Sequence, residues 1–112
     1  MSGRPTIHAS AAIYEGRGVL VRGASGAGKS RLVLDLIDEA RVRGRFAELI
    51  ADDRVEVEVH HGRLVARAPT PLAGRIELRG LGIVAIGHET AGVVALVVDI
   101  EETQPPRMPE EE

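Results

Sequence analysis

Gly23-Ala24-Ser25-Gly26-Ala27-Gly28-Lys29-Ser30 is the stretch of this sequence that most constrains its fold. It fits the pattern G-x-x-x-x-G-K-[ST] of a P-loop, in which glycines let backbone N–H groups converge on phosphate oxygens. Lys29 is the only lysine, and every other basic residue apart from histidine is arginine. We therefore expect Lys29, facing solvent while the site is empty, to reach the β- and γ-phosphates and Ser30 to place its hydroxyl on Mg²⁺.

The residues on either side of this loop have the order that a P-loop requires. An apolar run at residues 18–22 predicts a strand. Residues 31–43 predict a helix, because apolar side chains recur there at helical spacing until Gly44. The N-terminus of that helix would point its unpaired N–H groups at the same phosphates. This context favours a P-loop over the alternative, a glycine-rich turn that binds nothing.

Length and composition indicate one domain over residues 1–112, and a cytoplasmic location. Hydrophobic residues make up 44% of the chain, which is enough for a core. The absence of cysteine excludes disulfides and thiolate metal sites, as is usual in a reducing cytoplasm. Net charge is −3, and Tyr14 and Phe46 are the only residues of the Phe, Tyr and Trp types, so nucleic-acid binding is disfavoured. No apolar run reaches the roughly 20 residues of a membrane-spanning helix.

The rest of the chain predicts strands. Segments of strand length are either apolar or alternate between apolar and polar residues. These segments are residues 7–14, 46–51, 55–60, 64–68, 75–78, 83–86 and 93–100. A hairpin turn is expected at residues 61–62, and an exposed acidic tail from about residue 101. One main helix among about seven strands predicts an α/β fold with a strand-rich mixed sheet, not the βαβ alternation of a doubly wound enzyme.

Asp52 and Asp53 follow the predicted strand after the helix, where a P-loop enzyme keeps its metal-binding carboxylate. Neighbouring residues on a strand face opposite sides, so the two aspartates would have different tasks unless the strand has already ended. One would orient Mg²⁺ or its water, and the other would meet the attacking nucleophile. The alternative is that the pair only ends the strand and starts a turn.

Two other sets of polar residues indicate no site on spacing alone. Glu77 and Arg79 share one face of a predicted strand, which is the usual pattern of a solvated face. The four histidines have no metal-ligand spacing with one another. Each is therefore interpreted as structural or exposed.

Taken in order, these segments resemble the C-terminal catalytic domain of HPr kinase/phosphorylase. The resemblance rests on Ile7-His8, the P-loop, Ile50-Ala51-Asp52-Asp53-Arg54-Val55 and Ile76-Glu77-Leu78-Arg79-Gly80-Leu81-Gly82-Ile83. The last segment is more specific than the P-loop, and the match extends from about Ile7 to Arg107. The resemblance implies the fold of that domain, ATP and Mg²⁺ as cofactors, and an HPr-like phosphocarrier protein of the phosphotransferase system as substrate. It also implies a homo-oligomer, which is a hexamer in the family.

The resemblance implies roles for individual residues. His8 would support the catalytic carboxylate, and Lys29 would bind phosphate. Ser30 and Glu77 would hold Mg²⁺. With these roles, the chain is expected to be a serine protein kinase of the HPr kinase type.

The proton acceptor for the attacking serine would be Asp52 or Asp53, with Asp53 favoured, and Arg107 would stabilise charge. Family members continue beyond this arginine into a loop linked to phosphate-driven dephosphorylation, whereas here five residues follow, three of them glutamates. The chain thus looks like a short or truncated form. Because glutamates repel phosphate, we expect the reverse reaction, phosphorolysis, to be impaired.

Two other functions remain open. One is a small-molecule P-loop kinase; a GTPase is disfavoured, because the chain has no asparagine and no second lysine for an N-K-x-D motif. The other is a non-catalytic regulator that binds nucleotide without turnover. Phosphate transfer to a serine of an HPr-like protein would distinguish the expected kinase from both.

Overall fold

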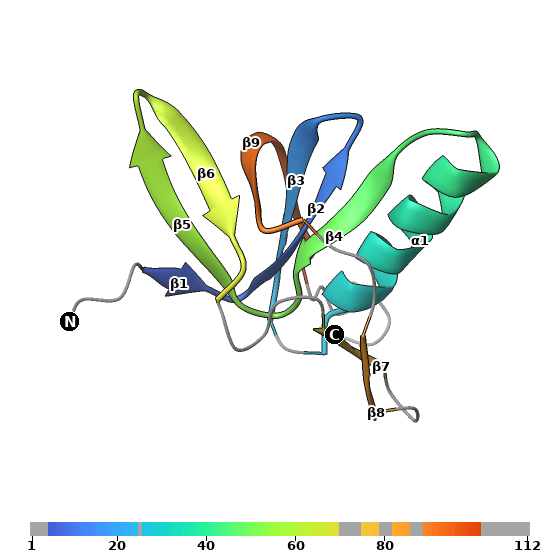
Figure 1. Cartoon of the computed structure of the whole chain (residues 1–112). Helices are drawn as coiled ribbons and strands as arrows, with labels where there is room; N and C mark the ends of the chain where they lie inside the picture. The colour runs from blue at the N-terminus through green and yellow to red at the C-terminus, as the bar shows by residue number, and fades with distance from the viewer. Residues whose placement is uncertain (1–4, 25, 70–74, 79–81, 86–88, 102–112) are drawn as a thin grey trace, which may run out of the picture.

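A computed structural model describes residues 5–24, 26–69, 75–78, 82–85 and 89–101 of the chain (Figure 1). Within these ranges there are one helix and nine strands. They are β1 (Thr6–Ile7), β2 (Ala9–Tyr14), β3 (Arg17–Arg22), α1 (Lys29–Val42), β4 (Ala47–Ala51), β5 (Val55–His60), β6 (Arg63–Arg67), β7 (Arg75–Leu78), β8 (Gly82–Ala85) and β9 (Ala91–Asp99). The predicted strand-rich fold with one main helix is confirmed. In the described part of the chain, no helix is long and apolar enough to cross a membrane.

Seven strands form one mixed sheet in the order β1-β5-β6-β9-β3-β2-β4, and β7 and β8 form a separate antiparallel pair. β2 is antiparallel to both β3 and β4. β9 is parallel to β3 and, at its start, antiparallel to β6. β3, β4 and β9 therefore run in the same direction, and their carboxyl ends meet at one edge of the sheet, at the bottom of Figure 1.

Tight turns and one bend set the strand boundaries. Glu15 and Gly16 close the β2–β3 hairpin with φ angles of 50° and 82°, and His61 and Gly62 close the β5–β6 hairpin with 50° and 76°. Two consecutive residues with positive φ are typical of tight hairpins, so the predicted turn at residues 61–62 is confirmed. The strand predicted over residues 7–14 is interrupted at His8, because β1 pairs with β5 whereas β2 pairs with β3 and β4.

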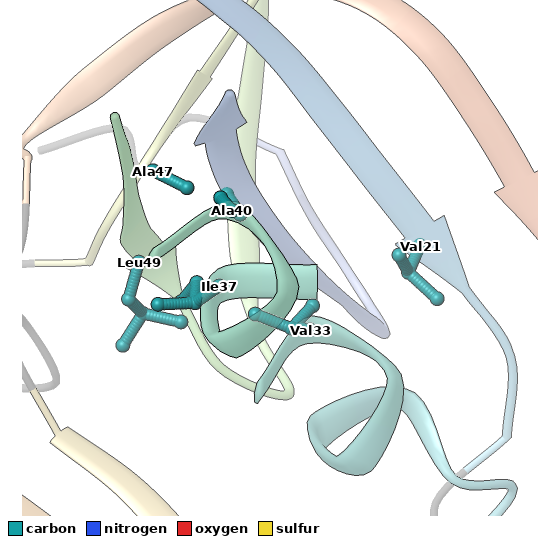
Figure 2. Packing of buried hydrophobic residues seen from close by; sticks show 7 residues of the cluster. Val21, Val33, Ile37, Ala40, Ala47 and Leu49 are labelled. Atoms are coloured by element: carbon teal, nitrogen blue, oxygen red, sulfur yellow. The ribbon is translucent and has the colours of Figure 1, made fainter. Parts of the chain in front are cut away.

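The sheet packs a hydrophobic cluster on each face. The cluster between α1 and the sheet consists of Ala12, Val21, Val33, Ile37, Ala40, Ala47 and Leu49 (Figure 2). The second cluster combines Val55 and Ala66 of the β5–β6 hairpin with Leu20 and Ile50 from β3 and β4. The helix contributes positions three and four residues apart, as an amphipathic helix does. This packing holds the N-terminus of α1 at the carboxyl ends of β3 and β4.

Candidate functional site

The glycine loop connects the end of β3 to the start of α1. Gly26 and Gly28 have φ angles of 85° and 101°, a left-handed region that is strained for residues with a side chain. Gly28 is the N-cap of α1, no side chain caps the helix there, and its first turn carries no acidic residue. No side chain therefore caps the first N–H groups of this helix, and such uncapped groups can bind an anion. Ser25 lies outside the described residues.

Lys29 is the first residue of α1 and is only 3% exposed. Its Nζ donates a hydrogen bond to the Ala24 carbonyl at 3.0 Å and lies 3.3 Å from Oδ1 of Asp53. The prediction that this lysine faces solvent in the empty site is wrong, because the loop carbonyl and the aspartate cover its ammonium group. Both contacts are ones that an arriving phosphate can replace.

The two aspartates after β4 contact different partners. Asp52 is 7% exposed and accepts a hydrogen bond from Ser30 Oγ at 2.5 Å. Asp53 has a half-exposed side chain that faces Lys29. β4 ends at Ala51, and the φ angle of 66° at Asp53 turns the backbone away from the strand direction. Both aspartates thus lie beyond the end of the strand. Their carboxylates can therefore reach the same site, where Asp52 contacts Ser30 and Asp53 contacts Lys29.

Ser10 is a candidate that sequence reasoning missed. It is fully buried in β2, where its Oγ donates to Asp52 Oδ1 at 2.8 Å and accepts from the backbone N–H of Asp53 at 3.0 Å. β2 lies between β3 and β4, so its first residues reach the edge where the glycine loop and the aspartates meet. The one signal in the sequence was a single hydroxyl within the otherwise apolar residues 9–13.

The other predicted site residues are less completely described. His8 is exposed, and its carbonyl accepts the N–H of Gly23 at 3.5 Å. Within the described ranges its imidazole forms no hydrogen bond with either aspartate. Glu77 belongs to β7, a strand that passes beside α1 (Figure 1). Arg107 and the acidic tail after residue 101 lie outside the described residues.

An ion pair borders the glycine loop. Arg22 ends β3, and its Nε and Nη2 donate to the two carboxylate oxygens of Asp99 at 2.6 and 2.9 Å. These hydrogen bonds, with the attraction between the charges, raise the pKa of Arg22 and lower the pKa of Asp99 from their ordinary values. The pair joins the ends of two parallel strands directly before Gly23.

The oxygen groups at the start of α1 suit Mg²⁺. This hard cation is usually held by one or two carboxylates together with water and substrate phosphates. Ser30 Oγ and the Asp52 carboxylate are already adjacent, next to the anion-binding end of the helix. Their chemistry therefore fits a hard divalent cation such as Mg²⁺, which these two groups would hold.

The fold and the site define an α/β protein in which a glycine loop leads from strand β3 into the N-terminus of α1. A glycine loop, a helix N-terminus, a buried lysine and an aspartate-bound serine converge at one edge of a mixed sheet. Comparison with known proteins identifies the family. The family described as HPr Serine kinase C-terminal domain matches residues 1–103, and the chain belongs to this family.

Curated relatives and a solved structure agree with this assignment. The chain is 42% identical to the HPr kinase/phosphorylase of Lactobacillus acidophilus over 84 residues, which cover 74% of this chain and 24% of the relative. It is 36% identical to that of Limosilactobacillus reuteri over 110 residues, covering 91% of this chain and 32% of the relative. The chain thus spans about a quarter to a third of the length of these relatives. The structure of the Hpr(Ser) kinase/phosphatase from Coxiella burnetii matches with a TM-score of 0.70 at 27% identity, over 95% of this chain and 66% of that one.

Proposed function

We propose that this chain is the catalytic unit of an ATP-dependent serine kinase that phosphorylates an HPr-like phosphocarrier protein. The observation that carries the proposal is that Lys29 and Ser30, adjacent in the first turn of α1, contact different aspartates of one pair. Phosphoryl transfer needs a cation on the phosphates, a hydroxyl and carboxylate for the metal, and a second carboxylate as base. Family membership, and relatives named HPr kinase/phosphorylase, support a phosphocarrier as the acceptor.

The glycine loop and Lys29 bind the phosphates of ATP. Lys29 exchanges the Ala24 carbonyl and Asp53 for β- and γ-phosphate oxygens, and the first N–H groups of α1 face the same oxygens. Because the ammonium is almost fully buried, water screens its attraction to phosphate only weakly. The exchange also releases the Asp53 carboxylate from its ion pair, which leaves it free for proton transfer.

Ser30 and Asp52 would hold Mg²⁺, with Glu77 as the further ligand that the family resemblance implies. When bound, the ion neutralises charge on the phosphate oxygens during transfer. Asp52 suits this role because it is buried and already accepts a hydrogen bond from the Ser30 hydroxyl. Replacement of Glu77 by glutamine is then expected to raise the Mg²⁺ concentration that turnover requires.

Asp53 serves as the general base. The oxygen of the acceptor serine attacks the γ-phosphorus of ATP, the bond from that phosphorus to the β,γ-bridging oxygen breaks, and ADP leaves. The serine proton passes to Asp53, whose half-exposed carboxylate a protein substrate can approach. His8 supports this carboxylate and Arg107 stabilises charge, as the resemblance implies.

The decisive experiment is transfer of ³²P from [γ-³²P]ATP to a purified HPr-type phosphocarrier, compared with a carrier whose acceptor serine is alanine. We expect Mg²⁺-dependent label on the first carrier and none on the second. ATP binding without transfer would favour a non-catalytic regulator, and label on a small molecule alone would favour a small-molecule kinase. The impairment of phosphorolysis stays a prediction, measured as pyrophosphate release from serine-phosphorylated carrier in phosphate buffer.

A homo-oligomer and a cytoplasmic location are also part of this proposal. Strand β9 exposes Val93, Leu96 and Val97 to 41%, 56% and 43%, and association between copies would cover such apolar side chains. ATP, as the phosphoryl donor, supports a cytoplasmic location. Light scattering at several protein concentrations measures the oligomeric state.

A further inference from the structure

Ser10 contacts both members of the aspartate pair, and the mechanism above gives it no task. We propose that Ser10 is a positioning residue that keeps Asp52 directed toward Ser30 and Asp53 directed toward Lys29. This inference rests on the proposed function, because it assigns a residue that holds the metal-binding carboxylate and the base in their separate positions.

The Ser10 hydroxyl uses its donor and an acceptor position in this site. It donates to Asp52 and accepts from the N–H of Asp53. Its donor bond ends on Oδ1 of Asp52, the same oxygen that accepts from Ser30. When the Ser30 hydroxyl turns toward a metal, Ser10 therefore still fixes the orientation of the Asp52 carboxylate. Because Ser10 is fully buried, water does not readily replace it.

The acceptor side of Ser10 fixes the backbone of the aspartate pair. Asp53 has a φ angle of 66°, which is costly for a residue other than glycine unless its surroundings hold it there. The bond from its N–H to Ser10, and the bond from the Arg54 N–H to the Asp52 carbonyl at 2.8 Å, hold this turn. This backbone turn directs the Asp53 side chain toward Lys29.

Ser10 itself is held rigidly, as a positioning residue must be. It pairs with Val21 in the β2–β3 ladder, and the next residue, Ala11, pairs with Ala51 on the other side of β2. Its backbone is thus fixed by strands on both sides, whereas both aspartates lie beyond the end of β4. A side chain from an inner strand therefore anchors two residues that lie beyond the end of the edge strand β4.

Four variants distinguish the effect of losing the Ser10 hydroxyl from the effect of changing the volume of the side chain. Ser10→Ala removes both hydrogen bonds. Ser10→Thr keeps the hydroxyl, and Ser10→Val has nearly the shape of that threonine without it, so their difference reports the hydroxyl alone. Tyr14→Phe is the matched control, because it removes a hydroxyl from the other end of β2, where Arg45 Nη1 donates to it at 2.9 Å.

We expect Ser10→Ala to lower kcat for phosphate transfer by roughly 10- to 100-fold, while the KM for ATP changes by less than about threefold. Two further readouts need no turnover. The Mg²⁺ concentration for half-maximal ATP binding, measured by calorimetry, should rise about tenfold. Hydrogen exchange at the Asp53 amide should also accelerate. Ser10→Thr should restore most of each property, Ser10→Val should not, and Tyr14→Phe should match the wild type.

The outcomes distinguish this inference from the proposed function. A wild-type chain that binds Mg²⁺ and ATP but transfers no phosphate contradicts the proposed function. In that case the Mg²⁺ dependence of ATP binding and hydrogen exchange at the Asp53 amide still test the role of Ser10. Unchanged Mg²⁺ dependence and unchanged exchange in Ser10→Ala overturn the inference. Equal defects in Ser10→Thr and Ser10→Val also overturn it, because volume would then be the cause. If circular dichroism shows that Ser10→Ala does not fold, the comparison of Ser10→Thr with Ser10→Val tests the inference instead.

Discussion

Replacing Lys29 with methionine should separate activity from stability. The ion pair of its ammonium with the half-exposed Asp53 contributes at most about 1 kcal/mol, and its hydrogen bond to the Ala24 carbonyl about 1.5–3 kcal/mol. Methionine has a side chain of similar length and avoids the cost of burying an ammonium at 3% exposure, which offsets much of this loss. We expect the free energy of unfolding to change by no more than about 2 kcal/mol, or Tm by roughly 10 °C.

Phosphate transfer should fall much further in the same variant. Two charge-assisted hydrogen bonds from Lys29 to phosphate oxygens, at about 1.5–3 kcal/mol each, correspond to a rate factor of roughly 10²–10⁴. The assay is the initial rate of ³²P transfer at saturating ATP, with thermal unfolding followed by circular dichroism on the same preparation. Lys29→Arg is the charge-retaining control, and it should also be slow, because a planar guanidinium is larger than the ammonium group that this buried position holds.

Two results would refute this reasoning. One is a folded Lys29→Met variant whose transfer rate lies within tenfold of the wild type, which would mean that the ammonium does not act on the phosphates. The other is a Tm loss of more than about 20 °C, which would mean that the lysine contributes mainly to folding.

Three further predictions concern the aspartates, a close strand contact and the ion pair beside the loop. Asp52→Asn should raise the Mg²⁺ requirement, whereas Asp53→Asn should depress kcat with ATP affinity largely unchanged; Mg²⁺ titrations of turnover and of ATP binding distinguish them. Gly18→Ala should destabilise the fold by about 1–3 kcal/mol in chemical denaturation, because its Cβ would lie 2.6 Å from a backbone oxygen of β9. Arg22 lowers the pKa of Asp99, so this carboxylate adds stability above its ordinary pKa and loses it as pH falls through the lowered value. Wild type should therefore be more stable than Asp99→Asn near neutral pH, and unfolding curves in strong acid should show the difference vanish.

Local sequence patterns were sufficient to predict the glycine loop, the helix and most strands. The helix begins at Lys29, two residues earlier than the predicted start at residue 31, because Gly28 acts as its N-cap. Predicted and observed strands differ by about two residues or less, apart from the break at His8. Such features depend on near neighbours in the chain. The position of β9 between β6 and β3 depends on distant pairing, which periodicity does not contain.

The roles of the site residues were harder to predict, because they depend on tertiary contacts. Strand alternation predicted that Asp52 and Asp53 face opposite sides unless the strand has ended before them. In the structure β4 does end before them, at Ala51. The burial of Lys29 and the contacts of Ser10 both arise from segments that are distant in sequence. The roles of His8, Glu77 and Arg107 come from the family resemblance and stay predictions.

The central position of β9 has a consequence for how the chain folds. Arg22 and Asp99, at the ends of β3 and β9, are 77 residues apart, whereas the β2–β3 and β5–β6 hairpins pair residues that are close in the sequence. During synthesis, these local units can form as they emerge from the ribosome, but the edges of β3 and β6 stay unpaired until residues 91–99 follow. Unpaired strand edges are sites of mispairing between chains. The nascent protein is thus most prone to aggregate just before its last central strand is inserted, and that insertion is the expected slow step of folding.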